Sequence, residues 1–393
     1  MTEYPTARIG DFCRTGSGST PSRSQLERYY QGGAIPWVKS GELREGIVIA
    51  TDEHITDAAL KETSVKLVPA GAILLAMYGA TVGQLAILGV EATTNQAVCH
   101  IVPDADAADT RYLYRAIAGQ VPAIIAMGVG GAQPNINQAV VKDLRIPLPP
   151  LPEQRRIAAI LDQADSLRAK RREALAQLDS LTQSIFIEMF GDPATNPRKW
   201  RIGSIAELLD SASYGTSQKS ASSGEFPVLR MNNLTRSGEL KLDDLKYMNL
   251  PEALRPRYLV KAGDVLFNRT NSAELVGKTA MVSASAPLLA YAGYLIRLRV
   301  NAANDPTYLS RFLNTRYAKQ MLRGMCKSII GMANINATEI QAMRIALPPL
   351  ALQQIFAARI RKVDTVKAIH RAALAESNAL FASLQHRAFS GEL

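Results

Sequence analysis

Residues 134–167, PNINQAVVKDLRIPLPPLPEQRRIAAILDQADSL, recur 199 positions later at residues 333–366 as ANINATEIQAMRIALPPLALQQIFAARIRKVDTV. The alignment needs no gap and continues as far as Phe190 and Phe389, with about twenty identical positions. Upstream the likeness is fainter but collinear, since residues 35–43 face 226–234, 69–79 face 261–271 and 111–117 face 307–313. The whole chain is therefore a duplicated unit, and its period is far longer than that of solenoid repeats.

The repeated tails have the pattern of long helices. Apolar residues such as Ile157, Leu161 and Ala164 recur at spacings of three and four, between Arg, Lys, Glu, Asp and Gln. Prolines stand at the start of both tails and Gly191 follows the end of the first, which marks helix boundaries. The pattern predicts a helix over about residues 152–190 and a second one of equal length in the other tail. Because each helix must bury one stripe, we expect an antiparallel pair.

The rest of each unit shows short apolar runs, such as AILLAMY, DVLFN and YLIRLRV, that are bounded by Gly, Pro, Asn and Ser. Such runs are typical of strands, and helical stretches at 110–119 and 306–323 interleave with them. The expected fold class is α/β (α+β), with two similar globular domains joined by two long antiparallel helices in a pseudo-two-fold duplication. The predicted segments are residues 1–150 (first globule), 151–195 (first long helix), 196–349 (second globule) and 350–393 (second long helix).

Composition narrows the function classes. The net charge of +10 favours a polyanionic partner, and the excess lies in the second half, with 12 basic and 14 acidic residues in 1–150 but 21 and 11 in 197–350. Three cysteines without a CxxC pair argue against a disulfide framework or a cysteine-built zinc site. No secretory signal is visible, so we expect a cytoplasmic protein. The uncharged run at 67–90 contains Pro69 and four glycines, which favours buried strands over a membrane span.

Catalytic motifs are missing from the sequence. The four histidines form no metal-ligand spacing, and neither GxSxG nor GxGxxG occurs. SAELVGKT at 272–279 resembles a phosphate-binding loop, but Ser272 replaces its first glycine. Gly277 faces Gly83 of the first unit, which favours a duplicated structural turn. We therefore expect a binding protein with no metal site, rather than a catalyst.

Side chains suited to reading duplex DNA cluster in both units. Arg and Lys pair with guanine, and Asn and Gln pair with adenine, when a scaffold that grips phosphates holds them in place. The candidates in the first unit are Lys39, Ser40, Arg44, Tyr78, Thr81, Gln84, Gln133, Asn135 and Asn137. The candidates in the second unit are Arg230, Asn232, Asn233, Arg269, Thr270, Asn271, Lys278, Asn334 and Asn336. Because Asn and Ser often serve turns and caps, a structural role for the repeated Asn-Ile-Asn triplets is an equal alternative.

The motif LPPLPEQRRIAAILDQADSL, followed by a helix that ends EMFGD and repeated as LPPLALQQIFAARI with a terminal AFSGEL, resembles the specificity (S) subunit of type I restriction–modification systems. The order of globule, helix, globule and helix covers the entire chain. The resemblance implies two target recognition domains, each of which reads one half of a bipartite, asymmetric site in double-stranded DNA. It also implies that the helices fix the length of the unread spacer between the two halves.

The resemblance further implies partners that carry the chemistry. The helices would dock two adenine-methylating (M) subunits, and two restriction (R) subunits would complete the nuclease. S-adenosylmethionine, ATP and Mg²⁺ would then belong to the partners, and this chain would need no cofactor. The docking candidates are Gln154, Arg155, Arg156, Ile157, Leu161, Gln353, Phe356 and Ile360. Residues 351–355 (ALQQI) lack the PEQRR of the first copy, so the two docking surfaces differ in sequence.

Three alternatives stay open. The chain could serve a fused methyltransferase–nuclease, or it could be a basic helical scaffold that joins proteins without reading sequence. A nucleotide-dependent enzyme built on residues 272–279 is the third alternative.

Overall fold

The computed structural model describes residues 4–127, 136–272, 274–329 and 332–393. Two compact units make up the chain. Unit 1 comprises Met1–Lys170 and Ala373–Leu393, and unit 2 comprises Arg171–Ala372. The division falls inside both long helices, α6 (Leu151–Phe190) and α11 (Leu350–Ser390), so each unit contains a half of each helix instead of ending where a helix begins.

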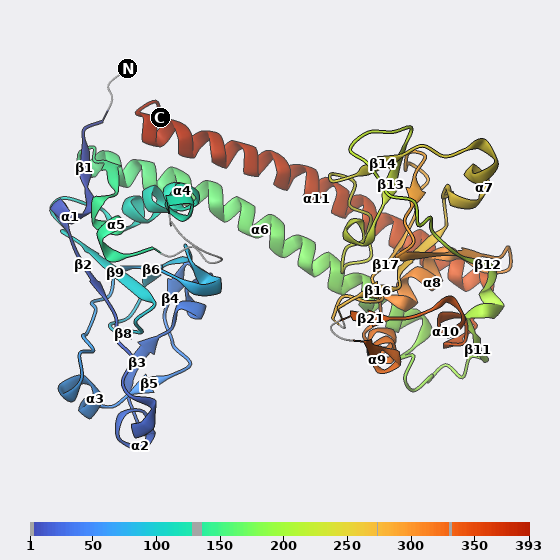
Figure 1. Cartoon of the computed structure of the whole chain (residues 1–393), viewed down its shortest axis with the longest axis horizontal. Helices are drawn as coiled ribbons and strands as arrows, with labels where there is room; N and C mark the ends of the chain where they lie inside the picture. Colours follow the sequence, from blue (N-terminus) through green and yellow to red (C-terminus); the bar gives the residue numbers. More distant parts are fainter. Residues whose placement is uncertain (1–3, 128–135, 273, 330–331) are drawn as a thin grey trace. The chain divides into compact units, whose positions relative to one another are not determined.

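In unit 1 the main sheet has five strands, of which only the edge pair β4–β7 is parallel (Figure 1). Their order is β2 (Cys13–Ser17), β9 (Val98–Pro103), β6 (Ile73–Ala76), β7 (Leu85–Leu88) and β4 (Ile47–Val48). The smaller sheets are β5 (His54–Ile55) with β3 (Ile35–Val38) and β8 (Thr93–Thr94), and β1 (Thr6–Arg8) with β10 (Arg145–Pro147). The helices are α1 (Ile9–Phe12), α2 (Leu26–Tyr29), α3 (Asp57–Glu62), α4 (Thr110–Met127) and α5 (Gln138–Asp143).

Unit 2 repeats most of this topology, but among the described residues its main sheet lacks a counterpart of β4 and it has one further small sheet. Its four-stranded sheet has the order β12 (Leu209–Tyr214), β19 (Leu295–Val300), β15 (Val265–Asn268) and β17 (Thr279–Met281). The smaller sheets are β14 (Lys246–Met248), β13 (Phe226–Leu229) and β18 (Ala290–Tyr291); β11 (Ile202–Ser204) and β22 (Arg344–Ala346); and β16 (Thr270–Asn271), β21 (Met332–Asn334) and β20 (Lys327–Ile329). The helices are α7 (Arg255–Tyr258), α8 (Pro306–Leu313), α9 (Arg316–Met325) and α10 (Ala337–Gln341).

The duplication extends to single hydrogen bonds. Tyr112 Oη donates to Pro147 O at 2.6 Å in unit 1, and Tyr308 Oη donates to Ala346 O at 2.7 Å in unit 2. The central strand of the small sheet pairs with one antiparallel and one parallel neighbour in each unit, as β3 with β5 and β8, and as β13 with β14 and β18. The predicted duplicated fold of mixed helices and strands is confirmed.

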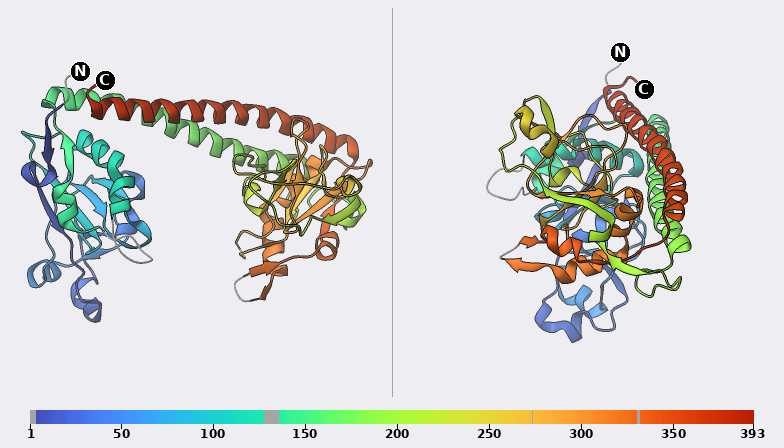
Figure 2. Two further views of the ribbon diagram at one scale, coloured as in Figure 1. Left: turned by 45° about the horizontal axis from the view of Figure 1, so that its top comes forward. Right: turned by 90° about the vertical axis from the view of Figure 1, so that its right-hand side faces the viewer.

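The two long helices run antiparallel within each unit, with α6 in green beside α11 in red (Figure 2). In unit 1, Arg168 Nε donates to Asn378 Oδ1 at 2.9 Å. In unit 2, Arg359 Nη1 donates to Glu188 Oε1 at 3.2 Å, and Lys367 pairs with Asp179. Because later positions of α6 meet earlier positions of α11, these contacts fix the antiparallel direction.

Each unit buries an apolar stripe of the helices against its own globule. The core of unit 1 takes in Ile157 and Leu161 of α6, whereas the core of unit 2 takes in Phe186 of α6 and Phe356 of α11. Burying such side chains contributes about 1.5–3 kcal/mol each. In each unit the long helices therefore share a core with one part of the globule, and two further apolar clusters of the globule lie apart from it.

The uncharged stretch at residues 67–90 forms β6, a 3-10 turn at Gly79–Thr81, and β7. Buried strands were expected there, and both strands lie in the main sheet of unit 1. Among the helices of the described residues, none combines the length and the apolar character that a membrane span needs.

Candidate nucleic-acid interface

A turn of the same construction follows β3 and β13. Lys39 N donates to Glu42 Oε2 at 2.6 Å in unit 1, and Arg230 N donates to Asn233 Oδ1 at 2.9 Å in unit 2. Asn233 is buried, and its Nδ2 donates to Lys241 O and Asp244 O. All of its polar atoms thus bind backbone, so the prediction of Asn233 as a base contact is wrong.

The turn in unit 2 is also the meeting point of candidates that are distant in sequence. Lys278 Nζ donates to Met231 O at 2.6 Å, and Asn271 Nδ2 lies 3.9 Å from Met231 Sδ. Burial and the nearby charge of Arg236 lower the pKa of Lys278 below its ordinary value. The structure therefore gathers Arg230, Asn271 and Lys278 around one turn.

A second group in unit 2 lies on the sheet β16–β21–β20. Thr270 Oγ1 donates to Asn334 Oδ1 at 3.3 Å, and the Arg269 guanidinium lies 4.9 Å from the centre of the Tyr214 ring. Asn336 caps α10, because its Oδ1 accepts from Glu339 N at 2.9 Å. Thr270 is buried, whereas Asn232 and Asn334 are exposed. The candidate residues of unit 2 that are exposed or half-buried, including Arg230, Arg269 and Lys278, therefore remain candidates for contact with DNA.

The basic excess of unit 2 is partly unneutralised at this surface. Lys319 Nζ donates to Gly277 O at 2.6 Å, close to the turn that carries Lys278. Arg236, Arg269 and Lys278 form no ion pair with a carboxylate among the residues that the structure describes. Lys319 also lacks such a pair, but burial lowers its pKa to about 7, so it is not counted with these cations. Cations that lack carboxylate partners are suited to phosphates, because they need not give up an existing ion pair.

In unit 1 the corresponding turn carries paired charges. Lys39 Nζ lies 3.0 Å from Glu53 Oε1, and Arg23 Nη2 lies 2.7 Å from Glu53 Oε2. The hydrogen bond to Glu53 raises the pKa of Lys39. Arg44 is exposed and Ser40 is half-buried at the start of a 3-10 helix, Ser40–Glu45. Lys39 is therefore engaged within its unit, and Arg44 is the cation of this turn that faces solvent.

The other candidates of unit 1 are divided between turn and core. Tyr78 packs against the main core, and Thr81 and Gln84 are half-buried at the turn between β6 and β7. The shielded Oε1 of Gln84 has no hydrogen-bond partner in the described part of the chain. Asn137 caps α5 by accepting from Val140 N at 3.0 Å. Gln133 and Asn135 lie outside the described residues.

The turn at Gly277, which ends the phosphate-loop-like stretch of unit 2, has a structural counterpart at Gly83 of unit 1. Gly277 and Gly83 each have a φ of +81°, and each N–H donates across the turn, to Asn268 O and Ala76 O respectively. A positive φ is readily adopted only by glycine, which explains the pair. The expected duplicated turn is confirmed. In the described residues, no group of three or more His, Cys, Asp and Glu side chains is arranged to hold a metal ion.

Six of the eight docking candidates are core residues. Gln154, Ile157 and Leu161 are fully buried in unit 1, as are Gln353, Phe356 and Ile360 in unit 2. They pack within their own unit and are not accessible to a partner, so the prediction is wrong for these six. Only Arg155 and Arg156 are exposed.

The two buried glutamines clip helix to globule in the same way. Gln154 Oε1 accepts from Asp109 N at 2.8 Å, and Gln353 Oε1 accepts from Asp305 N at 2.9 Å. Their Nε2 atoms donate to Pro149 O and Pro348 O. The repeated PPLxxQ motif thus encodes a structural joint.

Sequence reasoning missed a set of exposed apolar residues on the long helices. These residues are between 41% and 61% exposed, and they are Leu167 and Leu380 in unit 1 and Leu181, Ile187, Ile355, Val366 and Ile369 in unit 2. Leu167 and Val366 are equivalent at the offset of 199, and so are Leu181 and Leu380. The sequence does carry a signal for the paired positions. They are apolar in both copies although they lie outside the apolar spacing that faces the core.

Comparison with known proteins gives one consistent result. The family model for the type I restriction modification DNA specificity domain matches residues 1–177 and again residues 197–377. The EcoKI type I restriction enzyme specificity subunit of Escherichia coli (strain K12) is 25% identical over 96% of this chain and 86% of its own length. The StySPI specificity subunit of Salmonella potsdam is 23% identical, over 99% of this chain and 89% of its own length.

Two solved structures share the fold. The S subunit of a type I restriction–modification system from M. genitalium aligns with a TM-score of 0.59 and 15% identity, over 98% of this chain and 96% of that one. A chain from a type I R-M system, solved in work on complex assembly and conformational transition, aligns with a TM-score of 0.55 and 20% identity, over 100% and 98%. At these identities the likeness concerns the fold of the whole chain.

Proposed function

The chain belongs to the type I restriction modification DNA specificity family, and from this premise we propose that its two units each read one half of a bipartite, asymmetric site in duplex DNA. The observation that carries the proposal is a shared scaffold with different side chains at equivalent turns. Arg230 stands where unit 1 has Lys39, Asn232 where it has Gly41, and Lys278 where it has Gln84. Because base identity is read by such side chains, equal scaffolds with unequal turns favour two different half-sites.

The helices are proposed to dock two adenine methyltransferase subunits, one in each unit. The contacts Arg168–Asn378 and Lys367–Asp179 set the antiparallel register. In this register the exposed residues Leu167 and Leu380 lie at the same level of the helix pair in unit 1. Leu181 and Val366 do so in unit 2, and Ile369 lies one turn away. Exposed apolar side chains that repeat in both copies fit two similar protein partners.

The remaining parts of the proposal concern chemistry and location. The chain selects the sequence and catalyses nothing alone. S-adenosylmethionine, ATP and Mg²⁺ act in the methyltransferase and in two restriction subunits, and the assembly works in the cytoplasm. The two long helices set the spacer between the half-sites.

Two other functions make different predictions. An S subunit that serves a fused methyltransferase–nuclease would co-purify with a single large partner that carries both activities. A scaffold without sequence reading would bind duplex DNA in a salt-dependent way that does not discriminate sequence, even with its methyltransferase present.

The experiment that tests the proposal is a domain exchange. Residues 1–150 are replaced by the corresponding domain of the EcoKI specificity subunit, and the methylated motif is determined by single-molecule sequencing. We expect one half-site to change while the other half-site stays the same. A change in both halves, or in neither, would overturn the assignment of one half-site to each unit.

A further inference from the structure

Arg269 of unit 2 is held in one place by its backbone and by an aromatic ring. Its N–H donates to Tyr294 O at 3.0 Å, and its carbonyl oxygen accepts from Ile335 N at 2.9 Å. The guanidinium lies over the Tyr214 ring, 4.9 Å from its centre, and Tyr214 Oη accepts from Ala337 N at 3.0 Å. The negative face of such a ring attracts a cation. The side chain is therefore positioned before any ligand arrives.

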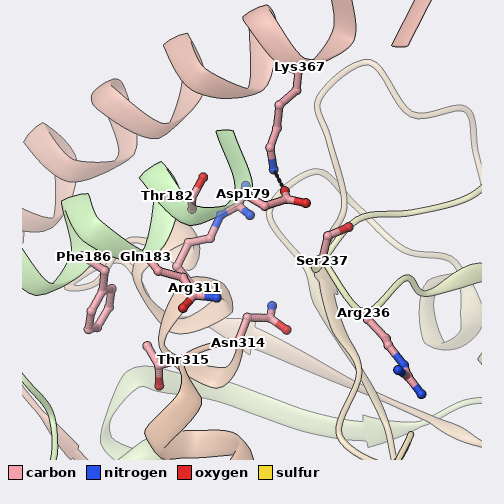
Figure 3. A pocket seen from close by; sticks show the side chains of 10 residues that line it. All are labelled: Asp179, Thr182, Gln183, Phe186, Arg236, Ser237, Arg311, Asn314, Thr315 and Lys367. Carbon is pink, nitrogen blue, oxygen red and sulfur yellow. Dashed lines mark ion pairs between the residues drawn. The ribbon is translucent and has the colours of Figure 1, made fainter. Parts of the chain in front are cut away.

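The guanidinium of Arg269 is positioned but has no partner for its donors. Other cations of unit 2 are held by carboxylates, since Lys367 pairs with Asp179 (Figure 3) and Arg311 Nη2 donates to both carboxylate oxygens of Asp364, at 2.8 and 2.9 Å. Among the described residues, the guanidinium of Arg269 has neither a carboxylate partner nor a hydrogen bond. Its Nε is shielded from solvent, whereas Nη1 and Nη2 are not. The two terminal nitrogens are therefore the donors that a ligand can reach.

Unit 1 has the same backbone frame with a different side chain. In the collinear alignment of the two units, Met77 is the counterpart of Arg269. Met77 N donates to Ala97 O at 2.8 Å, and Met77 O accepts from Ile136 N at 2.7 Å, which repeats both backbone hydrogen bonds of Arg269. Met77 is 5% exposed and packs in the core of its unit. A buried apolar residue thus stands where unit 2 has a partly accessible cation.

The ring that supports Arg269 is also absent from unit 1. Tyr214 pairs with Ile296 across β12 and β19, and Ser17 pairs with Cys99 across β2 and β9. Ile296 and Cys99 are counterparts, because they pair in turn with the aligned residues Phe267 and Leu75. Ser17 therefore stands where unit 2 has Tyr214. The arginine and its ring occur together in unit 2 and are both replaced in unit 1, as expected of two residues with one joint role.

We propose that Arg269 reads a guanine in the half-site of unit 2, with Tyr214 as its positioning residue. This inference rests on the proposed function, because it names the base that one residue of the interface selects. The major-groove edge of guanine offers two adjacent acceptors, N7 and O6, whereas that of adenine offers one acceptor and one donor. A guanidinium has donors only, so it matches guanine and opposes the amino group of adenine with a second donor. Arg269 N already donates to Tyr294 O, so the residue offers a phosphate no backbone N–H beside the guanidinium.

The test uses the full chain in complex with its methyltransferase partner. Single-molecule sequencing gives the methylated motif, and the exchange of residues 1–150 identifies the half-site of unit 2. Duplexes in which each G·C pair of this half-site is replaced in turn are then compared by fluorescence anisotropy. Arg269→Met installs the residue of unit 1. We expect it to lower the preference for G·C at a single position by about tenfold, because a bidentate contact to guanine is lost.

Matched variants separate base reading from a general loss of charge. Arg257 is an exposed arginine of α7 whose guanidinium lies 5.3 Å from the centre of the Tyr258 ring, and α7 lies apart from β16 and β21 (Figure 1). Arg257→Met should therefore leave every base preference unchanged. Tyr214→Ser should weaken the same G·C preference that Arg269→Met removes, and a full preference in this variant would contradict the positioning role. If Arg269→Met weakened binding to all duplexes by the same factor, the contact would be to phosphate and the proposal would be wrong.

A measurement on the natural chain keeps the proposal testable if the variants do not fold. 7-Deazaguanine lacks the N7 acceptor, and placing it at each guanine of the unit 2 half-site in turn should weaken binding by about tenfold at one guanine. No effect at any guanine, or a unit 2 half-site without a G·C pair, would overturn this inference and leave the proposed function intact. Absence of any bipartite motif would overturn the proposed function, and this inference with it.

Discussion

Replacing Gln353 by methionine should destabilise unit 2 by about 3 kcal/mol, because three hydrogen bonds of a fully buried side chain are lost at nearly constant volume. Gln353 Oε1 accepts from Asp305 N, and its Nε2 donates to Pro348 O at 2.9 Å and to Asn304 Oδ1 at 3.0 Å. Each such hydrogen bond contributes about 1 kcal/mol. The methionine would leave their partners buried and unpaired.

The chain offers a reporter and a control for this measurement. Its two tryptophans are divided between the units, so in a Trp37→Phe background the fluorescence of Trp200 reports unfolding of unit 2. At an m-value of about 2 kcal/mol per M, Gln353→Met should lower the urea midpoint by about 1.5 M. Gln354→Met changes the same residue type one position later, where the side chain is exposed, and should shift the midpoint by less than about 0.3 M.

Equal midpoints for the two variants would refute the reasoning. They would mean that the buried glutamine does not hold helix to globule, and that the repeated PPLxxQ motif has some other purpose. A second check is available in unit 1, where Gln154→Met should have a similar effect on the fluorescence of Trp37.

Three further outcomes follow from the same contacts. Leu181→Asp should prevent the methyltransferase from co-purifying at unit 2. Leu288→Asp, which changes a somewhat more exposed leucine of the globule, should not, and loss of co-purification in both variants would contradict the docking surface. Burial lowers the pKa of Lys319 to about 7, far below that of the unfolded chain, so the unfolded state binds more protons above pH 7 and stability should rise with pH. Relative to the Lys319→Met variant, the Tm of the natural chain should increase between pH 7 and 9, by about 2–4 °C for each kcal/mol gained in its free energy of unfolding. Parallel plots of Tm against pH for the two proteins would contradict this. Lys278→Met should weaken DNA binding and reduce the slope of log K against log salt by about 1, and an unchanged slope would exclude a phosphate contact.

The architecture could be predicted from the sequence because it depends on patterns that are local or repeated. The first long helix was expected from about residue 152 to 190 and runs from Leu151 to Phe190, since prolines and a glycine mark its ends. The runs DVLFN and YLIRLRV contain β15 and β19, which are buried strands of the main sheet. An offset of 199 residues was sufficient to establish two copies of one fold.

The site could be predicted only in part, because partners in space are distant in sequence. Nothing near Asn233 indicates that its amide binds Lys241 O and Asp244 O. The spacing of apolar residues on α6 and α11 likewise does not tell a stripe that packs on the globule from a stripe that binds a partner. For this reason the sequence predicts docking for Ile157 and Leu161, which the structure places in the core. The charge count, by contrast, correctly predicted one part of the site. The cations without carboxylate partners lie in residues 197–350, where basic residues exceed acidic ones.

Single-molecule sequencing of adenine methylation in the source strain, with and without this gene, tests the central claim most directly. We expect deletion to remove methylation at one bipartite motif, in both of its halves together, and to leave every other methylated motif in place. Unchanged methylation, or loss of a motif without a central unread spacer, would contradict the claim that two units of this chain read two separated half-sites.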